Sequence, residues 1–502
     1  MLMPEVEVGA PSVEDAAPAV RLVSAADDLS GAPADKLAAQ VALRIEAEII
    51  RRGWPVGEVL GSEQNLREEY GVSRSVLREA VRLVEHHQVA RMRRGPNGGL
   101  FVCAPDAVPA TRALVIYLEY IGLSVEDLMH ARLLLEPLAA SIAADLIEEN
   151  GIERLRALLV EEGERRDEPG IYSQDVLHVL LGELSGNPAL ELFIDVLTRM
   201  TTRYAHTTRR VSKDEAAQGK RSSRERHVAI VEAVIAGDGG RAASAMAEHL
   251  EETTAWLLAH RIKRVGRPTT ARTEVADGPG AKLAEVIASR IHDEIARRGW
   301  PIGHVLGSET DLLARYGISR AVLREAVRLL EYHSVARMRR GPGGGLVVAE
   351  PEPDASIDTM ALYLDYRAVG PQHLQIVREA VELGTLERVI ARREDPDVAL
   401  RLDAAIDRTD EATAPGRTGA DHFHTELADL SGNPVLGLFL RILTELWSRH
   451  TANTASPAPG PDAADAVVAI HRRILDALLE GDGGVARHRM RRHLEALTAW
   501  YH

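Results

Sequence analysis

Arginine side chains recur at one-turn spacing in two nearly identical stretches of the chain. The set consists of Arg74, Arg78 and Arg82 in the first stretch and Arg320, Arg324 and Arg328 in the second. On a helix, residues four apart lie on the same face. A guanidinium group forms paired hydrogen bonds with a phosphate or with the edge of guanine. The spacing therefore indicates contacts to DNA, and the alternative is a solvated helix face without a partner.

The local charge balance favours the DNA interpretation. Residues 74–94 contain six arginines and two glutamates, a net charge of +4, and residues 320–340 have the same balance. The whole chain has a formal net charge of −15. Phosphate binding depends on the local basic patch and not on the overall charge. Two basic regions in an acidic chain are therefore typical of nucleic-acid binding.

The residues around the arginines predict the elements that position them. Ser73 is placed to cap a helix, and apolar residues recur at three- and four-residue spacing from Val76 to Val84. A short strand around Val89, a glycine-rich turn and a second strand through 100–102 follow. Upstream, we expect a helix from Asp35 to near Gly53 and a short helix over 63–70. Three helices and a β-hairpin predict a winged helix-turn-helix domain over 35–104.

The rest of the first half predicts helices only. We expect them at residues 110–121, 125–148, 151–166, 171–184, 188–209, 221–236 and 239–260, separated by glycine, proline and asparagine breaks. Such a pattern predicts an all-α helical bundle over 105–261. The predicted fold class is therefore mainly α, with a winged helix-turn-helix domain followed by a helical bundle.

The whole arrangement occurs twice. Residues 298–346 are identical to residues 52–100 at 36 of 49 positions, with an offset of 246. The offset becomes 244 between the two Gly-Asp-Gly-Gly segments at 237–240 and 481–484. The second copy predicts a winged domain over 282–350 and an all-α bundle over 351–502. We expect residues 1–34 to form a disordered acidic tail. Residues 262–281 should form a linker, either a plain solvated tether or one that touches phosphates weakly.

Composition narrows the class of protein. The 502 residues contain 45% hydrophobic and 27% charged residues, which is typical of a globular protein with several domains. One cysteine, Cys103, excludes an intramolecular disulfide and fits a reducing cytoplasm. No apolar run is long enough for a membrane span, and no signal peptide opens the sequence. We expect a cytoplasmic protein without a membrane partner.

Several motifs together resemble the GntR family of bacterial transcription regulators. These are Ser73-Arg74, the run 77–80 with sequence LREA, and the wing 93–99 with sequence RRGPNGG. The helical half, with RLLLE at 132–136 and His178 seven residues before Ser-Gly-Asn-Pro, resembles the FadR-type effector domain of that family. The resemblance covers about 35–260 and 282–502, and the presence of two full copies in one chain is unusual.

The resemblance implies that the chain is not an enzyme and that it binds a double-stranded DNA operator. In the family, positions matching Arg74 and Arg78 contact DNA from the recognition helix, and the glycine turn of the wing lies against the groove. Carried over to both copies, the implied DNA-binding residues are Ser73, Arg74, Arg78, Arg93, Arg94, Gly98, Ser319, Arg320, Arg324, Arg339, Arg340 and Gly344. The chain departs from the family at Gln64 and Thr310, where an arginine is common.

The resemblance also implies a divalent metal, zinc- or nickel-like, in each effector domain. The implied ligands are Asp175, His178, His227 and His249 in the first copy and Asp421, His424, His471 and His493 in the second. The family aspartate lies four residues before the first histidine, whereas Asp175 and Asp421 lie three before. Three imidazoles and a carboxylate suit such an ion. Each histidine alone could instead be a hydrogen-bonded core residue.

Arg132 and Arg378 resemble the family arginine that meets an effector carboxylate, and we expect a small carboxylate or acyl metabolite. The alternative role for each arginine is a helix-stabilising pair with Glu136 or Glu382. Two further hypotheses use the histidines differently, as a metal-dependent hydrolase or as a metal-stapled structural protein. A hydrolase needs a general base such as the glutamate of an HExxH motif, which the sequence lacks.

The duplication predicts a covalent pseudo-dimer that reads a near-palindromic operator, because related single-copy regulators dimerise on DNA. The linker would raise the effective concentration of one copy around the other. The effector, the operator sequence, the sign of regulation and any further association of two chains stay open at this point.

Overall fold

A computed structural model describes residues 34–95, 98–164, 176–205, 212–260, 283–341, 343–408, 421–453 and 461–499. Within these ranges the chain is mainly α-helical, with two small sheets, which confirms the predicted fold class. No helix in this part of the chain is long and apolar enough to cross a membrane. The predicted acidic tail and linker lie outside the described residues.

The first winged domain contains the three predicted helices and the predicted hairpin. Its elements are α1 Ala34–Arg51, β1 Val59–Gly61, α2 Glu63–Glu69, α3 Arg74–His86, β2 Ala90–Arg93 and β3 Gly99–Val102. The strands are antiparallel in the order β1-β3-β2, with Arg93 opposite Gly99 at the end of the hairpin. Strand β1 was not predicted; it makes the wing part of a three-stranded sheet and not an isolated hairpin. The core consists of apolar side chains from α1, α3 and the sheet, among them Ile45, Leu77 and Leu100.

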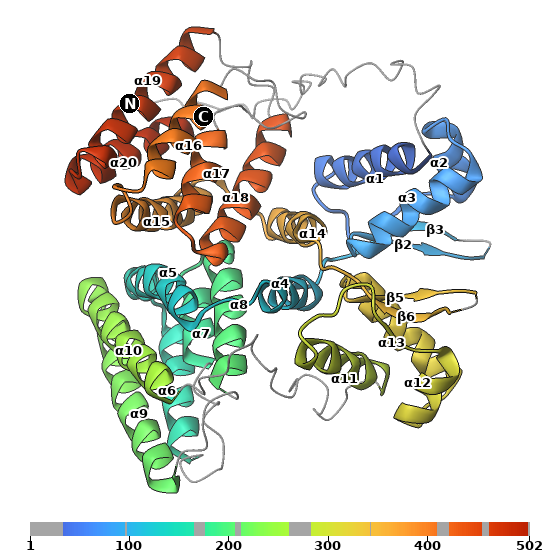
Figure 1. Cartoon of the computed structure of the whole chain (residues 1–502), viewed down its shortest axis with the longest axis horizontal. Coiled ribbons are helices and arrows are strands. Elements are labelled where there is room, and N and C mark those ends of the chain that lie inside the picture. Colours follow the sequence, from blue (N-terminus) through green and yellow to red (C-terminus); the bar gives the residue numbers. More distant parts are fainter. Residues whose placement is uncertain are drawn as a thin grey trace, which may run out of the picture.

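The second winged domain repeats this architecture. Its elements are α11 Leu283–Arg297, β4 Val305–Gly307, α12 Glu309–Tyr316, α13 Arg320–Tyr332, β5 Ala336–Arg339 and β6 Gly345–Val348. The strand order β4-β6-β5 matches that of the first domain. Both winged domains lie on the right of Figure 1, and both hairpins extend in the same direction.

The helical halves form two bundles. The first contains α4 Ala107–Ile121, α5 Val125–Leu146, α6 Glu149–Glu164, α7 Val176–Leu184, α8 Pro188–Ala205, α9 Lys213–Ile235 and α10 Gly239–His260. The second contains α14 Pro353–Tyr366, α15 Pro371–Ile390, α16 Pro396–Asp407, α17 Asp421–Leu430, α18 Pro434–Asn453, α19 Pro461–Leu479 and α20 Gly483–Ala499. The predicted start of one helix at residue 221 was wrong. Helix α9 begins eight residues earlier, because Ser212 and Glu215 form a capping box there.

The two copies cross over where the winged domains meet the bundles. Leu362 of α14, in the second copy, is fully buried in the core of the first winged domain. Its counterpart Ile116 of α4, in the first copy, is buried in the core of the second winged domain. Figure 1 shows α4 and α14 between the bundles and the winged domains. Each winged domain therefore completes its core with a helix from the other copy.

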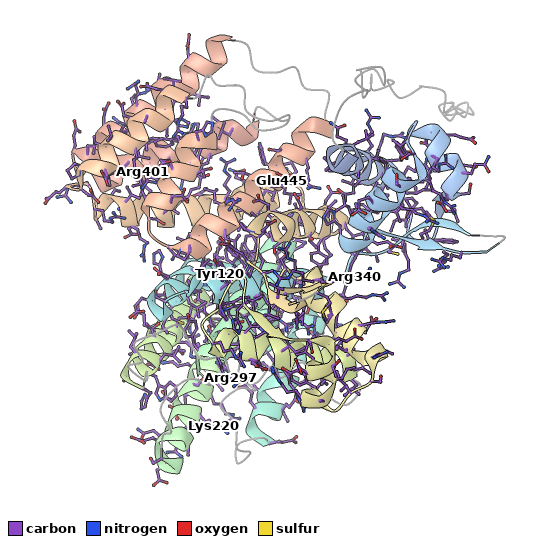
Figure 2. The ribbon with its side chains drawn as sticks, turned by 45° about the vertical axis from the view of Figure 1, so that its right-hand side comes forward. Tyr120, Lys220, Arg297, Arg340, Arg401 and Glu445 are labelled. Carbon is purple, nitrogen blue, oxygen red and sulfur yellow. The ribbon has the colours of Figure 1, made fainter. Side chains whose placement is uncertain are left out.

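Aromatic side chains fix both crossings. In one, the Trp54 indole donates a hydrogen bond to Asp365 Oδ2 at 3.0 Å and packs edge-on against Tyr366. In the other, Trp300 packs edge-on against Tyr120, whose hydroxyl donates a hydrogen bond to Glu350. Tryptophan and tyrosine bury a large apolar surface and keep one polar atom for a specific partner. Tyr120 is labelled in Figure 2, at the centre of the molecule.

Charged side chains at the crossing of the first winged domain include a histidine. His87 Nδ1 lies 2.5 Å from Glu46 Oε1, and Arg449 pairs with Asp358 at 3.0 Å. Burial alone would lower the pKa of His87, but the Glu46 and Asp358 carboxylates raise it above the usual value. The charged form of His87 is therefore favoured in this crossing.

The other crossing has the opposite electrostatic character. His292 occupies the position of Glu46, and its Nε2 lies 3.4 Å from the Glu119 carboxylate, which pairs with Arg203. Burial, with Arg203 and Arg112 nearby, lowers the pKa of His292 well below its usual value. The neutral form of His292 is therefore favoured. Both crossings contain a carboxylate paired with an arginine, but only the first favours a charged histidine.

The bundles pack against each other through equivalent residues of the two copies. Phe193 of α8 and Phe439 of α18 stack with ring centroids 3.9 Å apart. Asn187 donates a hydrogen bond to the main-chain oxygen of His373, and Asn433 donates one to that of Asp127, each at 3.0 Å. These bonds join the Ser-Gly-Asn-Pro turn of each copy to the first turn of α5 or α15 in the other. The duplicated chain therefore has an approximate internal twofold relation.

Candidate functional site: two arginine faces and two histidine clusters

The first recognition helix, α3, presents its arginines to solvent. The Ser73 hydroxyl accepts a hydrogen bond from the Val76 amide and caps the helix, as predicted. The Arg74 and Arg78 side chains are 60% and 58% exposed, and both pair with Glu63, at 2.7 Å and 3.2 Å. These hydrogen bonds lower the pKa of Glu63 below its usual value, with Arg74 the main cause. The two side chains are thus held together on one accessible face.

The second recognition helix, α13, has the same face with a looser acidic contact. Ser319 caps the helix through the Val322 amide. Arg320 is 74% exposed and lies 3.7 Å from Glu309. Arg324 occupies the position of Arg78 and is also exposed. The two faces therefore have the same arginines but differ in how a glutamate restrains them.

The wings place a second set of arginines beside the helices. Arg93, Arg94, Arg339 and Arg340 are all exposed. Gly98 and Gly344 close the turns, because an added Cβ would lie 2.4 Å from the carbonyl oxygen of Arg93 or Arg339. Only glycine fits such a close backbone approach. Arg340, labelled in Figure 2, directly follows β5.

A groove separates the first recognition helix from its wing. Its volume is about 720 Å³, and its lining includes Glu63, Arg74 and Arg78 on one side and Arg93 and Gly98 on the other. Except for Ser73, the predicted DNA-binding residues of the first copy thus come together around one concave, basic surface.

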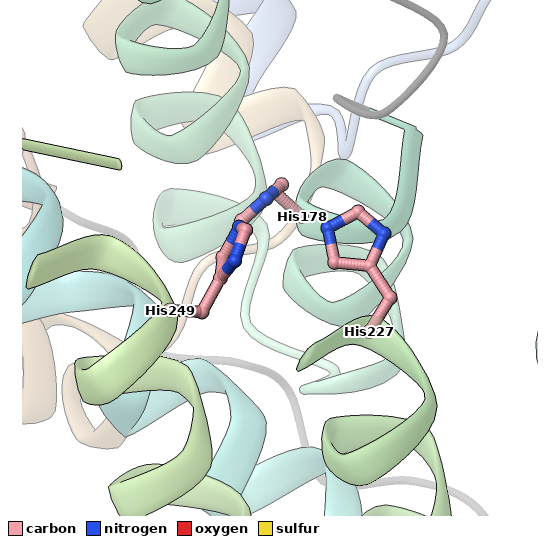
Figure 3. Close-up of side chains that lie close together, drawn as sticks. All are labelled: His178, His227 and His249. Atoms are coloured by element: carbon pink, nitrogen blue, oxygen red, sulfur yellow. The ribbon is translucent and has the colours of Figure 1, made fainter. Parts of the chain in front are cut away.

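Three buried histidines meet in the first bundle. His178 of α7, His227 of α9 and His249 of α10 offer ring nitrogens that lie within 4.8 Å of one another (Figure 3). Glu136 of α5 holds His178 Nδ1 at 2.6 Å, and Glu162 of α6 holds His227 Nδ1 at 2.9 Å. Burial and the neighbouring imidazoles lower the pKa of His249 well below its usual value. A neutral imidazole is the form that binds a metal.

The second bundle brings together the equivalent histidines. His424 of α17, His471 of α19 and His493 of α20 point their Nε2 atoms at one another, with His493 Nε2 at 3.2 Å from that of His424 and 3.0 Å from that of His471. Glu382 holds His424 Nδ1. Burial, with His424 nearby, lowers the pKa of His493 to about 3.

These clusters fit a divalent ion. When a glutamate accepts the proton on Nδ1, the Nε2 atom of a neutral histidine is an acceptor, so the cluster concentrates acceptor nitrogens in a buried space. Nitrogens bound to zinc at about 2.0–2.1 Å lie about 3.3 Å apart in a tetrahedral site. The separations in the second bundle are close to that value. His178, His227 and His249, and likewise His424, His471 and His493, are thus suited to hold a zinc- or nickel-like ion.

The predicted carboxylate ligands are not placed. Asp175 lies outside the described residues, and Asp421 is the first residue of α17, where the backbone but not the side chain is described. Their role as ligands stays a prediction.

Arg132 and Arg378 each lie beside a histidine cluster. Each pairs with the glutamate that contacts the first histidine of that cluster. Arg132 pairs with both oxygens of Glu136 and donates a hydrogen bond to Thr201 at 3.0 Å. Arg378 pairs with Glu382 at 2.6 Å. Burial alone would raise the pKa of Glu136 and of Glu382, but in each case the neighbouring arginine and histidine lower it to about 2. The helix pair considered as an alternative is therefore present in both copies.

Two family models match this chain, each of them twice. The model described as bacterial regulatory proteins, gntR family, matches residues 37–102 and 283–346, and the FCD domain matches residues 127–252 and 374–496. The matched segments contain nearly all of both winged domains and most of both bundles. The chain belongs to the GntR family.

Relatives of this GntR-family chain are transcription regulators. It is 30% identical over 198 residues to the HTH-type transcriptional regulator LutR of Bacillus subtilis, a match that covers 39% of this chain and 89% of LutR. It is 31% identical over 224 residues to the uncharacterized HTH-type transcriptional regulator Rv0494 of Mycobacterium tuberculosis, covering 43% and 88%. The HTH-type transcriptional repressor NanR of Escherichia coli is 25% identical, over 44% and 85%.

A solved structure, of Streptococcus agalactiae GntR, covers 44% of this chain and 99% of its own, with 23% identity and a TM-score of 0.33. The family and its members are DNA-binding transcription regulators and not enzymes, so this GntR-family protein is one too. The hydrolase hypothesis is thereby wrong.

Sequence reasoning missed the part that glutamates play in the helical sites of this GntR-family protein. Glu136 and Glu382 were considered only as helix partners of arginine, yet each also holds the first histidine of its cluster. Glu162 was not singled out, and it holds His227. The four-residue spacing gave a signal for the arginine pairs, but the contacts to histidine join helices far apart in sequence.

Proposed function

We propose that this chain is a ligand-responsive, sequence-specific transcription regulator in which the two winged domains of one chain read a near-palindromic operator. The observation that carries the proposal is the crossed packing of Ile116 and Leu362, which places each winged domain on a helix of the other copy. Dimeric regulators obtain two reading helices by pairing two chains. Here one chain supplies both, as a covalent pseudo-dimer.

The arginines of α3 and α13 and those of the wings serve as the DNA contacts. All of them are exposed, and the bases and phosphates of a duplex offer the planar acceptors that guanidinium groups recognise. The two recognition helices differ in their contacts to a glutamate. Glu63 pairs with two arginines of α3, whereas Glu309 lies at a longer distance from one arginine of α13. Gln64 and Thr310 also differ between the copies. These differences suit an operator whose half-sites are similar but not identical.

The two bundles respond to a small carboxylate or acyl metabolite, with the help of a divalent metal. The histidine clusters supply the ligands, and a bound ion would provide a positive charge for an effector carboxylate. Arg132 and Arg378 lie beside the clusters and provide a second positive charge. An effector carboxylate would bind them in competition with Glu136 and Glu382. An effector changes DNA binding only by favouring one arrangement of the chain over another.

Mobility-shift titration with an operator selected from random DNA tests this proposal. We expect Arg78→Ala and Arg324→Ala each to weaken binding, and the affinity of the intact chain to fall steeply with salt. Arg241→Ala is the control, because Arg241 is exposed on α10 at a distance from both winged domains in sequence and fold. An operator complex with one chain supports the pseudo-dimer. Unchanged binding by both variants contradicts the DNA interface, and two chains per operator contradict the pseudo-dimer alone.

A further inference from the structure

The internal twofold relation is also broken at a cavity between the two copies. The cavity has a volume of about 410 Å³ and lies between α4 of the first copy and α17 and α18 of the second. Its lining includes Tyr117, Ile121, Asp429, Gly437 and Arg441. A volume of this size is typical of sites for small molecules.

The equivalent place on the other side is filled by an ion pair. Arg367 stands at the position of Ile121, and Glu191 stands at the position of Gly437. Arg367 Nη2 donates to Glu191 at 3.0 Å, and its Nη1 donates to the Tyr363 hydroxyl at 2.8 Å. These contacts raise the pKa of the Arg367 guanidinium above its usual value. The contacts show what this place in the fold accommodates: a guanidinium between a carboxylate and a tyrosine.

The open side keeps the tyrosine, lacks the carboxylate of Glu191, and has a carboxylate from another position instead. Tyr117 occupies the position of Tyr363, and Asp429 contributes a carboxylate to the cavity. A Cβ added at Gly437 would meet only Asp429 Oδ1, at 3.9 Å, so the space next to that carboxylate is open. Burial and the neighbouring Glu426 raise the pKa of Asp429 by more than Arg401 and Arg441 lower it, and a further cation beside Asp429 would offset the rise.

The other charge at the cavity is already compensated. Arg441 lines the cavity, and its Nη2 pairs with Asp354 Oδ1 at 2.5 Å. Asp429 forms no ion pair of this kind among the described residues. The uncompensated charge facing the cavity is therefore negative, which favours a cationic ligand over an anionic one.

We propose that this cavity binds a small metabolite with a terminal guanidinium group. The guanidinium takes the place that Arg367 fills on the other side, donating to the Asp429 carboxylate and the Tyr117 hydroxyl, and the aliphatic part of the ligand lies against Ile121 and Leu438. The site differs from the histidine clusters and from the arginine faces, so the inference goes beyond the proposed function and does not depend on it.

Calorimetric titration of the full chain with agmatine tests the site. The matched ligand is N-carbamoylputrescine, in which a neutral ureido group replaces the guanidinium. We expect saturable binding of one agmatine per chain and at least tenfold weaker binding of the ureido compound. Asp429→Asn, which hardly changes the volume, should also weaken agmatine binding at least tenfold. Equal binding of the two ligands, or wild-type affinity in the Asp429→Asn chain, overturns the proposal, as does a lack of saturable agmatine binding.

Two further variants use the internal relation as a control. Ile121→Arg combined with Gly437→Glu rebuilds the ion pair of the other side and should abolish agmatine binding. Arg367→Ala empties the other side and should raise the stoichiometry to two. Cooperative thermal unfolding and operator binding check that each variant is folded. A folded double variant that still binds agmatine with wild-type affinity overturns the location of the site.

Discussion

Phe193 and Phe439 lie face to face across the contact between the two bundles, with an interplanar angle of 5°. They occupy equivalent positions in the two copies and both are fully buried. Each ring therefore packs against its own counterpart, as in the interface of a symmetric dimer. The contact joins the two copies into one hydrophobic core.

Replacing either ring should destabilise the joined bundles. We expect Phe193→Ala and Phe439→Ala each to lower the free energy of unfolding by about 3–5 kcal/mol, the usual cost of a buried phenylalanine. Urea unfolding followed by circular dichroism measures it. Val160→Ala is the control, because Val160 is 61% exposed. Equal effects of the core and control variants would show that the stacked rings do not support the interface.

The wing turn should tolerate no side chain at its last glycine. An alanine at Gly98 would place Cβ 2.4 Å from the Arg93 oxygen and 2.8 Å from the Gly95 oxygen, so the turn must open. We expect Gly98→Ala to weaken operator binding about tenfold, equivalent to about 1.4 kcal/mol, with little change in thermal midpoint. Gly240→Ala is the control, since its Cβ would meet only Asp238 Oδ1 at 3.8 Å. Full operator affinity in Gly98→Ala would rule out a role for the wing.

Each bundle should hold its own metal ion. We expect the chain, stripped with a chelator and dialysed against zinc or nickel, to bind two ions by mass spectrometry under native conditions. His227→Ala should reduce the number to one, because the second cluster is independent. His260→Ala should leave it at two, since His260 stacks on Trp256 outside the cluster. Two tightly bound ions in His227→Ala would exclude this ligand set.

The same samples separate a sensor from a structural site. If metal raises the thermal midpoint and no small carboxylate changes operator affinity, the clusters only stabilise the bundles. If a small carboxylate changes operator affinity only in the metal-loaded chain, the proposed effector site is supported.

The crossing at the first winged domain should weaken in alkali. The pKa of His87 is raised in the folded chain, so its proton stabilises the fold fully below about pH 6.5 and the stabilisation is lost as the pH rises through the folded pKa. We expect the thermal midpoint to fall between pH 7 and 9, and to fall less in His87→Gln. Differential scanning calorimetry across this range measures both. An identical pH profile in the variant would remove His87 from the explanation.

The crossing at the second winged domain should show the opposite dependence of stability on pH, and it serves as the comparison. The pKa of His292 is lowered in the folded chain. Below about pH 6.5, His292 therefore binds a proton in the unfolded chain but not in the folded chain. Stability is then lost as the pH falls, and His292→Gln should reduce that loss. An undiminished loss of stability on the acid side in His292→Gln would remove His292 from the explanation.

Local patterns were sufficient for the recognition helices. The predicted start of α3 after Ser73 is confirmed, because the cap and the amphipathic spacing are both local signals. The prediction missed β1, since a three-residue strand has no period of its own and pairs with β3 about forty residues away. The start of α9 was misplaced because the capping box at Ser212 was overlooked.

Contacts between helices far apart in sequence needed the structure. The two sets of three histidines were predicted as groups from the resemblance to the family's effector domain, and they do meet. The glutamates that hold them, and the burial of Leu362 in the other copy's winged domain, depend on how whole helices pack. No short-range pattern contains that information. The ion pair between Arg367 and Glu191 and its absence on the other side likewise needed the structure, because the two residues are 176 positions apart in the sequence.

The exchange of Ile116 and Leu362 has a consequence for biosynthesis. The ribosome releases the first winged domain long before it translates α14, so that domain must wait with an apolar face uncovered until the second bundle arrives. Complete folding of the first winged domain thus depends on a helix of the second copy, which is synthesised later. If the gene is divided between the two copies, we expect each half to aggregate when expressed alone and to remain soluble when the two halves are co-expressed.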